Sequence, residues 1–233
     1  GMPCDMKEIK KISNKYNLRI IEDCSQAHGS KIGKKYVGSF GDIAVFSFCQ
    51  DKIISTGGEG GMIVTNNKKL YENIWSLKDI GKNKKKYFTV SKDLNKFPYL
   101  HDSIGTNARI TEIQSCIGNY QLKHLKSYIR VRNENAKIFF NKLKNCEHLI
   151  IPKHNSQITH SYYRYTVIIS NEKLSRSILM KNLKKKGVAC TVGGCPTIYK
   201  EKYFVEKYNV NIKNYPNPEY LKNRTISFLV DQT

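Results

Sequence analysis

The sequence has no apolar run near the ~18 residues needed to cross a membrane, so no membrane span is predicted. It also begins without the basic and apolar blocks of a secretory signal. Its seven cysteines form no Cys-x-x-Cys pair, and Cys190 and Cys195 have no neighbouring histidine. We therefore expect free thiols in a reducing cytoplasm and no metal site.

Acidic residues are also scarce, since 19 acids face 40 basic residues and give a formal net charge of +21. Such a charge is typical of nucleic-acid binding. However, the lysines are spread along the chain, and the densest groups, at 82–86 and 184–186, carry little interleaved aromatic or glycine signature. We favour a basic cleft for an anionic substrate and expect no nucleic-acid partner, with a basic nucleic-acid binder as an open alternative.

With 39% apolar residues, the 233-residue chain can bury the core of one large or two small domains. Strand-like and helix-like segments alternate, which predicts an α/β fold with some antiparallel pairing in the second part. Strands are predicted at 18–21, 43–48, 62–65, 162–169, 188–192 and 225–229. Helices are predicted after a capping box of Asp5 and Glu8, at 70–80, at 111–145 with one break, at 174–186 and at 218–222. Residues 31–41 are predicted as a loop or hairpin, and residues 81–106 and the stretch from Gly193 to the last helix as irregular.

Polar side chains follow two of the predicted strands. Lys52 comes after the strand 43–48 and is followed by a glycine-dense turn at 57–61, while Asp23 and Gln26 follow the strand 18–21. A lysine held by rigid backbone can act as an amine nucleophile. Because open α/β sheets bind ligands at the carboxyl ends of their strands, these residues predict a ligand site.

Five blocks of the sequence together resemble the nucleotide-sugar aminotransferases of the DegT/DnrJ/EryC1/StrS family. They are residues 22–29, 38–42, 46–52, 56–61 and 105–114, and the resemblance runs from Pro3 to the C-terminus. It implies a partial large domain of the PLP-dependent transferase fold (fold type I, the aspartate aminotransferase fold) with a mostly parallel sheet, plus a smaller α/β C-terminal domain. We expect the large pyridoxal 5'-phosphate (PLP) domain at residues 1–122 and the small domain, incomplete, at 123–233. The resemblance also implies a homodimer.

The resemblance assigns roles to five residues. Lys52 resembles the lysine that links to the cofactor and then moves a proton between cofactor and substrate carbons, and Asp23 resembles the partner of the pyridine nitrogen. Gln26 resembles the residue near the ring oxygen, Ser47 a phosphate ligand, and Asn107 a residue that reaches the phosphate across the dimer interface. Four of them also have a plain structural reading. Lys52 can be a solvated lysine, Asp23 a helix or turn cap after the strand, Ser47 a hydroxyl bonded to backbone, and Asn107 a turn asparagine.

Two departures from the family pattern limit what can be carried over. Residues 1–6 resemble an internal stretch of these enzymes and the chain ends short of their last helices, so we expect a fragment truncated at both ends. The upstream part would hold the phosphate-gripping turn, and we therefore expect weak or absent cofactor binding by this chain alone. Residues 193–196 stand where many relatives carry a histidine-aromatic pair, so the sugar preference is not transferred.

The resemblance implies an aminotransferase that converts a nucleotide-linked keto-sugar to an amino-sugar, with glutamate as amino-acid donor, for polysaccharide or related glycan biosynthesis. Relatives that dehydrate sugars carry histidine at the place of Lys52, which favours transamination. The alternative is a catalytically inactive truncated remnant or interaction module of the same fold.

Overall fold

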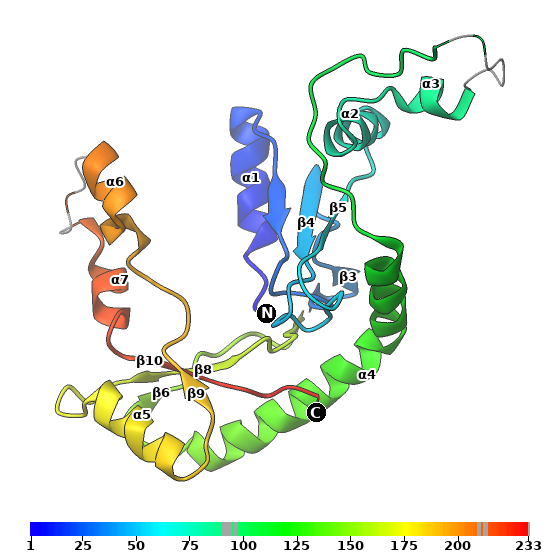
Figure 1. Cartoon of the computed structure of the whole chain (residues 1–233). Coiled ribbons are helices and arrows are strands. Elements are labelled where there is room, and N and C mark those ends of the chain that lie inside the picture. The colour runs from blue at the N-terminus through cyan, green and yellow to red at the C-terminus, as the bar shows by residue number, and fades with distance from the viewer. Residues whose placement is uncertain (90–94, 96, 209–210, 212–213, 233) are drawn as a thin grey trace. The chain divides into compact units, whose positions relative to one another are not determined.

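The computed structural model describes residues 1–89, 95, 97–208, 211 and 214–232, which form two compact units. The first unit contains residues 2–126, and the second contains residue 1 and residues 127–233 (Figure 1). The long helix α4 (Glu112–Leu143) supplies residues to both units. Its 32 residues are continuous, so the predicted break is wrong. No proline lies within it, and Gly118 costs only about 1 kcal/mol because it keeps its backbone N–H.

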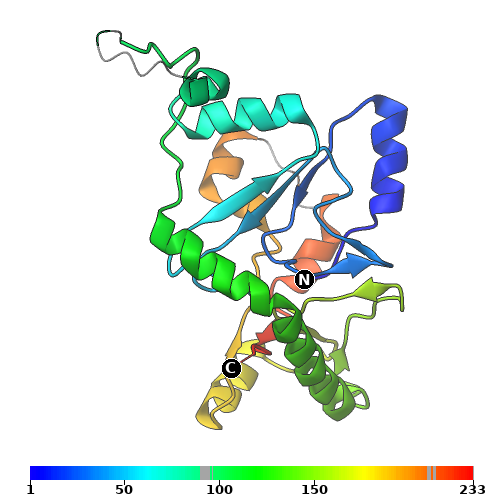
Figure 2. The same cartoon turned by 90° about the vertical axis from the view of Figure 1, so that its right-hand side faces the viewer.

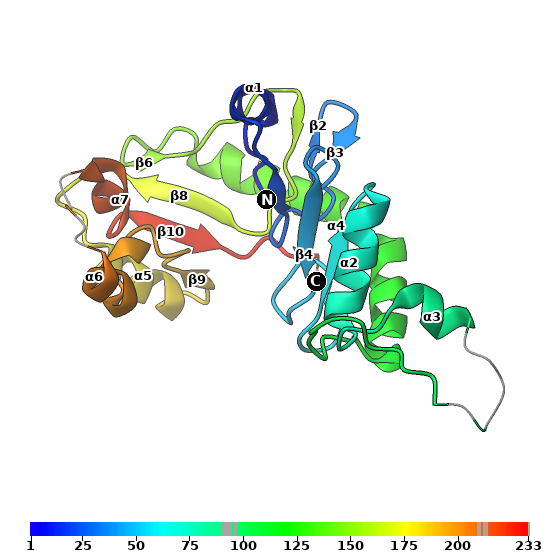
Figure 3. The same cartoon turned by 90° about the horizontal axis from the view of Figure 1, so that it is seen from above.

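A three-stranded sheet forms the centre of the first unit. It contains β1 (Ile21–Asp23), β4 (Ile43–Ser47) and β5 (Gly61–Val64) in the order β1-β4-β5, with β1 parallel and β5 antiparallel to β4. Figure 2 shows these strands side by side. Helix α1 (Met6–Tyr16) lies on the β1 side and α2 (Lys68–Lys78) on the β5 side (Figure 3). The segment 31–41 contains the hairpin of β2 (Lys31–Ile32) and β3 (Lys35–Tyr36).

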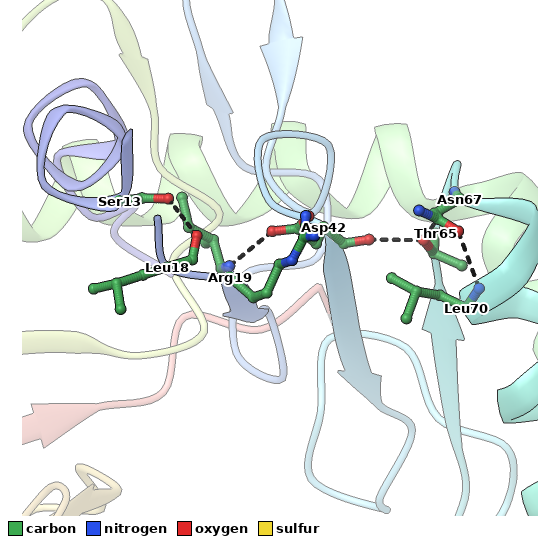
Figure 4. A network of polar contacts seen from close by, with 8 residues as sticks. Ser13, Leu18, Arg19, Asp42, Thr65, Asn67 and Leu70 are labelled. Atoms are coloured by element: carbon green, nitrogen blue, oxygen red, sulfur yellow. Dashed lines mark hydrogen bonds and ion pairs between the residues drawn. The ribbon is translucent and has the colours of Figure 1, made fainter. Parts of the chain in front are cut away.

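Asp42 fixes the start of this sheet. Its carboxylate accepts hydrogen bonds from the backbone N–H of Ile20 at 2.8 Å and from Arg19 at 3.0 Å, and its carbonyl accepts one from Thr65 at 2.7 Å (Figure 4). The predicted strand 18–21 therefore begins late, because Ile20 bonds to Asp42 and only Ile21 enters the ladder. With the three strands joined at this edge, their other ends, which carry Asp23 and Ser47, are placed by register.

Local hydrogen bonds decide two helix starts differently from the predictions. At α1, Asp5 accepts the N–H groups of Lys7 and Glu8 as expected, but Glu8 pairs with Lys11 at 2.7 Å and does not complete the capping box. The helix α3 (Lys84–Thr89) lies within 81–106, which was predicted to be irregular, so the prediction is wrong for these residues. Residues 90–94 and 96 of this segment lie outside the described part of the chain. Asn83 caps it by accepting the N–H of Lys86 at 3.0 Å.

An antiparallel sheet forms the core of the second unit, as predicted for this part. Its order is β6-β8-β10-β9, from β6 (Leu149–Ile150), β8 (Tyr165–Ile169), β10 (Thr225–Phe228) and β9 (Cys190–Thr191). Buried side chains of β8 and β10 pack against Ala136 and Phe139 of α4 and against Leu179 and Leu183 of α5 (Arg176–Lys185). Figure 3 shows β8 beside β10. Strand β8 begins after Tyr162, whose φ of 47° is left-handed and incompatible with a strand.

The remaining elements are short. They are β7 (Ile158–Thr159), the 3₁₀ turn η1 (Ile198–Lys200), α6 (Lys202–Lys207) and α7 (Pro216–Leu221). The turn η1 and helix α6 lie in the stretch that was predicted to be irregular, so that prediction is wrong there. Among the residues described, no helix combines the length and the apolar character needed to cross a bilayer.

Candidate functional site

Two strands of the first unit end at the same edge of the sheet. In the parallel pair, Asp23 is opposite Val45, two residues before Ser47, and the N–H of Cys24 donates to the carbonyl of Val45 at 2.9 Å. Strand β5 begins at this edge too, because Gly61 pairs with Ser47. The pairing therefore brings Asp23, Ser47 and the start of the Lys52 loop to one edge, as the sequence predicted for the strand ends.

The two acids at the end of β1 have different surroundings. Glu22 is buried, and its carboxylate accepts backbone N–H groups of Phe40 and Gly41 at 2.6 Å each and of Gly38 at 2.8 Å. It holds the loop 38–41 in place, a role that sequence reasoning missed because the donors lie 16 to 19 residues away. Successive side chains of a strand point to opposite faces, so Asp23 points away from this loop.

Asp23 is exposed and ionised. Its carboxylate accepts the backbone N–H of Ser25 at 3.0 Å. Hydrogen bonds from Ser25 lower the pKa of Asp23 most, burial opposes them, and the positive charge of Lys52 adds a smaller lowering effect. The carboxylate therefore stays negative at neutral pH and interacts electrostatically with the Lys52 amine.

Lys52 lies in a fixed loop between β4 and β5. Its N–H donates to the carbonyl of Cys49 at 3.0 Å, and Thr56 closes the loop by donating to Phe48 at 3.1 Å. The next two residues, Ile53 and Ile54, are 1% and 3% exposed and anchor the loop in the interior. The Lys52 side chain is only 14% exposed, and its Nζ lies 3.1 Å from Asp51. Because its amine is recessed and its loop is anchored, Lys52 agrees better with the predicted nucleophile than with the alternative interpretation as a solvated surface lysine.

Helix α4 and the glycine turn complete this loop within the first unit. Gln114 donates through Nε2 to the carbonyl of Glu59 at 2.8 Å, and the N–H of Ser55 donates to Gln121 at 3.4 Å. Gly57 has a left-handed φ of 79°, a backbone conformation that residues with a side chain rarely adopt. The turn is thus specified by both backbone conformation and contacts with α4.

The other three predicted residues are placed as follows. Gln26 is exposed in the turn after β1. Ser47 is half-buried, and its Oγ accepts the N–H of Cys49 at 3.3 Å, as the backbone-bonding alternative predicts. Asn107 lies in a different part of the unit, between α3 and α4, where its Oδ1 accepts a hydrogen bond from Arg109 Nε at 3.0 Å.

Asp79, at the end of α2, is a charged residue that sequence reasoning missed. It is 7% exposed and lies 3.2 Å from Lys82 Nζ, 3.5 Å from Arg109 Nη1 and 3.6 Å from Lys78 Nζ. Its backbone also forms an isolated antiparallel bridge with Asn107. The sequence gives no signal for this cluster, because Arg109 is 30 residues away and an acid at a helix end is usually solvated.

Comparison with known proteins identifies the family. Residues 1–232 match the DegT/DnrJ/EryC1/StrS aminotransferase family, so the chain belongs to that family. It is 37% identical over 208 residues to the GDP-perosamine synthase of Escherichia coli O157:H7, an alignment that covers 87% of this chain and 53% of the synthase. The chain therefore spans about half the length of this relative.

Solved structures of the family share the fold. An aminotransferase from Psychrobacter cryohalolentis is 34% identical, with a TM-score of 0.86 over 98% of this chain and 61% of that one. GDP-4-keto-6-deoxy-D-mannose-3-dehydratase from E. coli, solved with bound hydrated PLP, is 25% identical, with a TM-score of 0.88 over 100% of this chain and 61% of that one. The predicted α/β fold of this family is confirmed.

Proposed function

We propose that this chain carries the cofactor-linking lysine, Lys52, of a PLP-dependent nucleotide-sugar aminotransferase. The observation that carries the proposal is the pair of Lys52 and Asp23 at one edge of the sheet, an amine and a carboxylate that interact electrostatically. The family membership and the PLP-bound relative support the same conclusion.

The residues present fit the chemistry of PLP. A pyridine nitrogen that must stay protonated needs an ionised carboxylate, and the pKa of Asp23 is held low by Ser25 and Lys52. An aldehyde needs an amine held in place, and the 14% exposed Lys52 supplies one from a loop anchored by buried neighbours. Of the two adjacent acids of β1, the buried Glu22 accepts hydrogen bonds from the loop 38–41. The exposed Asp23 makes none with this loop and can face a cofactor.

When bound, PLP supplies an electron sink for the carbanion at the substrate carbon. In this proposal Asp23 holds the proton on the ring nitrogen, and Lys52 Nζ carries the proton between the reacting carbons. Gln26 would hold the group on its ring-oxygen side, and Ser47 and Asn107 would donate to its phosphate, with Asn107 supplied by the second copy of a dimer. Residues 1–122 form the cofactor-binding part and residues 123–233 the small domain.

For the whole protein we propose transfer of an amino group from glutamate to a nucleotide-linked keto-sugar for polysaccharide biosynthesis. The relatives named for GDP- and dTDP-linked amino-sugars support this substrate class. We further propose a cytoplasmic homodimer. The odd number of cysteines, seven, with no Cys-x-x-Cys pair in the sequence supports a reducing compartment. Exposed apolar side chains at the start of α4, such as Ile113 at 76%, support burial against a second copy. A monomeric mass in sedimentation at micromolar concentration would contradict the dimer.

The activity is tested by ¹⁵N transfer. The protein is supplied with PLP, ¹⁵N-glutamate and a panel of GDP- and dTDP-linked keto-sugars, and the product is weighed by mass spectrometry. We expect one ¹⁵N in the sugar, and a loss of at least about 100-fold for Lys52→Arg, which keeps the charge but cannot shuttle the proton. Lys68→Arg, on the surface of α2, is the control. Equal transfer by Lys52→Arg would overturn the proposed role.

A further inference from the structure

The amide of Asn107 has a defined orientation. Arg109 Nε lies 3.0 Å from the amide atom that faces it. A guanidinium has only donors, so the atom facing it must be the amide oxygen. The two N–H donors of Asn107 are therefore turned away from Arg109 and are available to an acceptor.

Arg109 is in turn held by Asp79. The Asp79 carboxylate lies 3.5 Å from Arg109 Nη1 and is only 7% exposed. Burial raises the pKa of this carboxyl, but the hydrogen bond from Lys82 and the charges of Lys82, Lys78 and Arg109 outweigh it, so the pKa is lowered and the group is charged at neutral pH. A buried charge of this kind cannot turn to solvent, which makes it a fixed anchor for the guanidinium.

The backbone beside Asn107 is fixed by the same helix end. The N–H groups of Thr106 and Ala108 donate to the carbonyls of Leu77 and Lys78 at 2.7 and 2.9 Å, and the N–H of Ile80 donates to Thr106 at 3.1 Å. The first two of these bonds use carbonyls that the last turn of α2 leaves without helical partners. Both the backbone and the side chain of Asn107 are thus set by residues at the end of α2.

We propose that Asp79 is a positioning residue which, through Arg109, fixes the Asn107 amide so that its N–H₂ group is presented to a phosphate. This inference rests on the proposed role of Asn107 as a phosphate ligand. For a variant that lacks the Asp79 charge, this inference and a purely electrostatic model predict opposite changes in phosphate affinity. Removing the negative charge of Asp79 would strengthen anion binding if only charge mattered, whereas loss of positioning weakens it.

The test is a titration of the chain with inorganic phosphate at constant ionic strength, followed by NMR. The Asn107 side-chain N–H₂ signals, which Asn107→Ala identifies, report on the amide, and the backbone amide signals of the segment 105–108, which every variant retains, report phosphate binding in all samples. The exchange protection of Arg109 Nε–H is measured in the same samples. We expect Asp79→Asn to weaken the phosphate response by about fivefold, the effect of one hydrogen bond, and to remove the protection. Arg109→Lys keeps the positive charge and changes a half-exposed side chain. We expect it to weaken the phosphate response by a similar factor. Asp102→Asn removes an equal charge from the ion pair with Lys86 and is expected not to weaken binding.

The outcomes distinguish the positioning role of Asp79 from the phosphate-binding role of Asn107. If Asp79 acts through Asn107, the double variant of Asp79→Asn and Asn107→Ala binds phosphate no more weakly than Asn107→Ala alone. Unchanged or tighter binding by Asp79→Asn, with Asn107→Ala weakened, would overturn the positioning role and leave the phosphate role of Asn107 intact. No phosphate response at Asn107 in the unaltered chain would overturn both. The proposed attachment of PLP to Lys52 is tested by a separate measurement, and neither outcome of the phosphate titration decides it.

Discussion

Two adjacent acids, Glu22 and Asp23, have different surroundings at the end of one strand, and single substitutions should separate them. Glu22→Gln replaces a carboxylate oxygen that receives backbone N–H groups with a donor, so we expect a loss of at least about 2 kcal/mol in the free energy of unfolding. Asp23→Asn keeps an oxygen for Ser25, and we expect a change within about 0.5 kcal/mol but weaker PLP binding. Urea unfolding and fluorescence titration measure both. A destabilised Asp23→Asn with normal PLP binding would reverse the assignment.

His160 predicts a pH dependence of stability in the second unit. Burial first, and then the charge of the N-terminal amine and His154, lower the pKa of His160 to about 3. Its Nδ1 accepts the N–H of Tyr162 at 2.7 Å, which requires the neutral ring. The unfolded chain, with a histidine pKa of about 6.5, takes up a proton that the folded chain does not. Stability should therefore be full above about pH 6.5 and fall by about 1.4 kcal/mol per pH unit below it.

A substitution isolates this contribution. His160→Asn keeps an acceptor but does not titrate, so its stability should vary less between pH 4 and pH 7 than that of the unaltered chain. His148→Asn, at an exposed histidine of the same unit, is the control. Thermal unfolding across this range measures both, and an unchanged pH profile in His160→Asn would show that another group titrates.

At the scale of elements, Gly105 joins the segment 105–108 to the end of α2. A side-chain Cβ at this position would lie 2.7 Å from the carbonyl carbon of Ile80 and 2.8 Å from the carbonyl oxygen of Leu77. Because backbone atoms cannot move aside cheaply, we expect Gly105→Ala to cost about 1–3 kcal/mol and to disturb Asn107. Gly194→Ala, where a Cβ meets nothing within 4 Å, should change stability little. Differential scanning calorimetry compares the two variants, and equal melting temperatures would refute the packing argument.

Elements were predictable from sequence where a local pattern specifies them. The strands that end near Asp23 and Ser47, and the loop that carries Lys52, follow from short apolar runs and glycine-rich turns. Helix α3 depends on the cap that Asn83 provides, and the continuity of α4 depends on its packing. Neither the cap nor the packing is announced by a clear local sequence pattern. The contacts of Glu22 with the loop 38–41 and of Asp79 with Arg109 also escaped prediction, because they join residues 16 to 30 positions apart.

At the scale of the whole molecule, a net charge of +21 accompanies membership of a family whose named relatives act on nucleotide-linked sugars. A basic protein attracts such anionic ligands over the range of about 10 Å set by ionic screening. The central claim, however, depends on one lysine among many, because surface lysines also react with aldehydes. The question is whether the fold selects Lys52.

The most direct measurement is reductive trapping of PLP on the whole protein that contains this chain. The protein is incubated with rising concentrations of PLP, reduced with borohydride and digested, and each labelled lysine is located by mass spectrometry. We predict that Lys52 is labelled at lower PLP concentrations than exposed lysines such as Lys68, and that Asp23→Asn removes this preference while leaving surface labelling unchanged. Labels distributed over surface lysines with no preference for Lys52 would contradict the account.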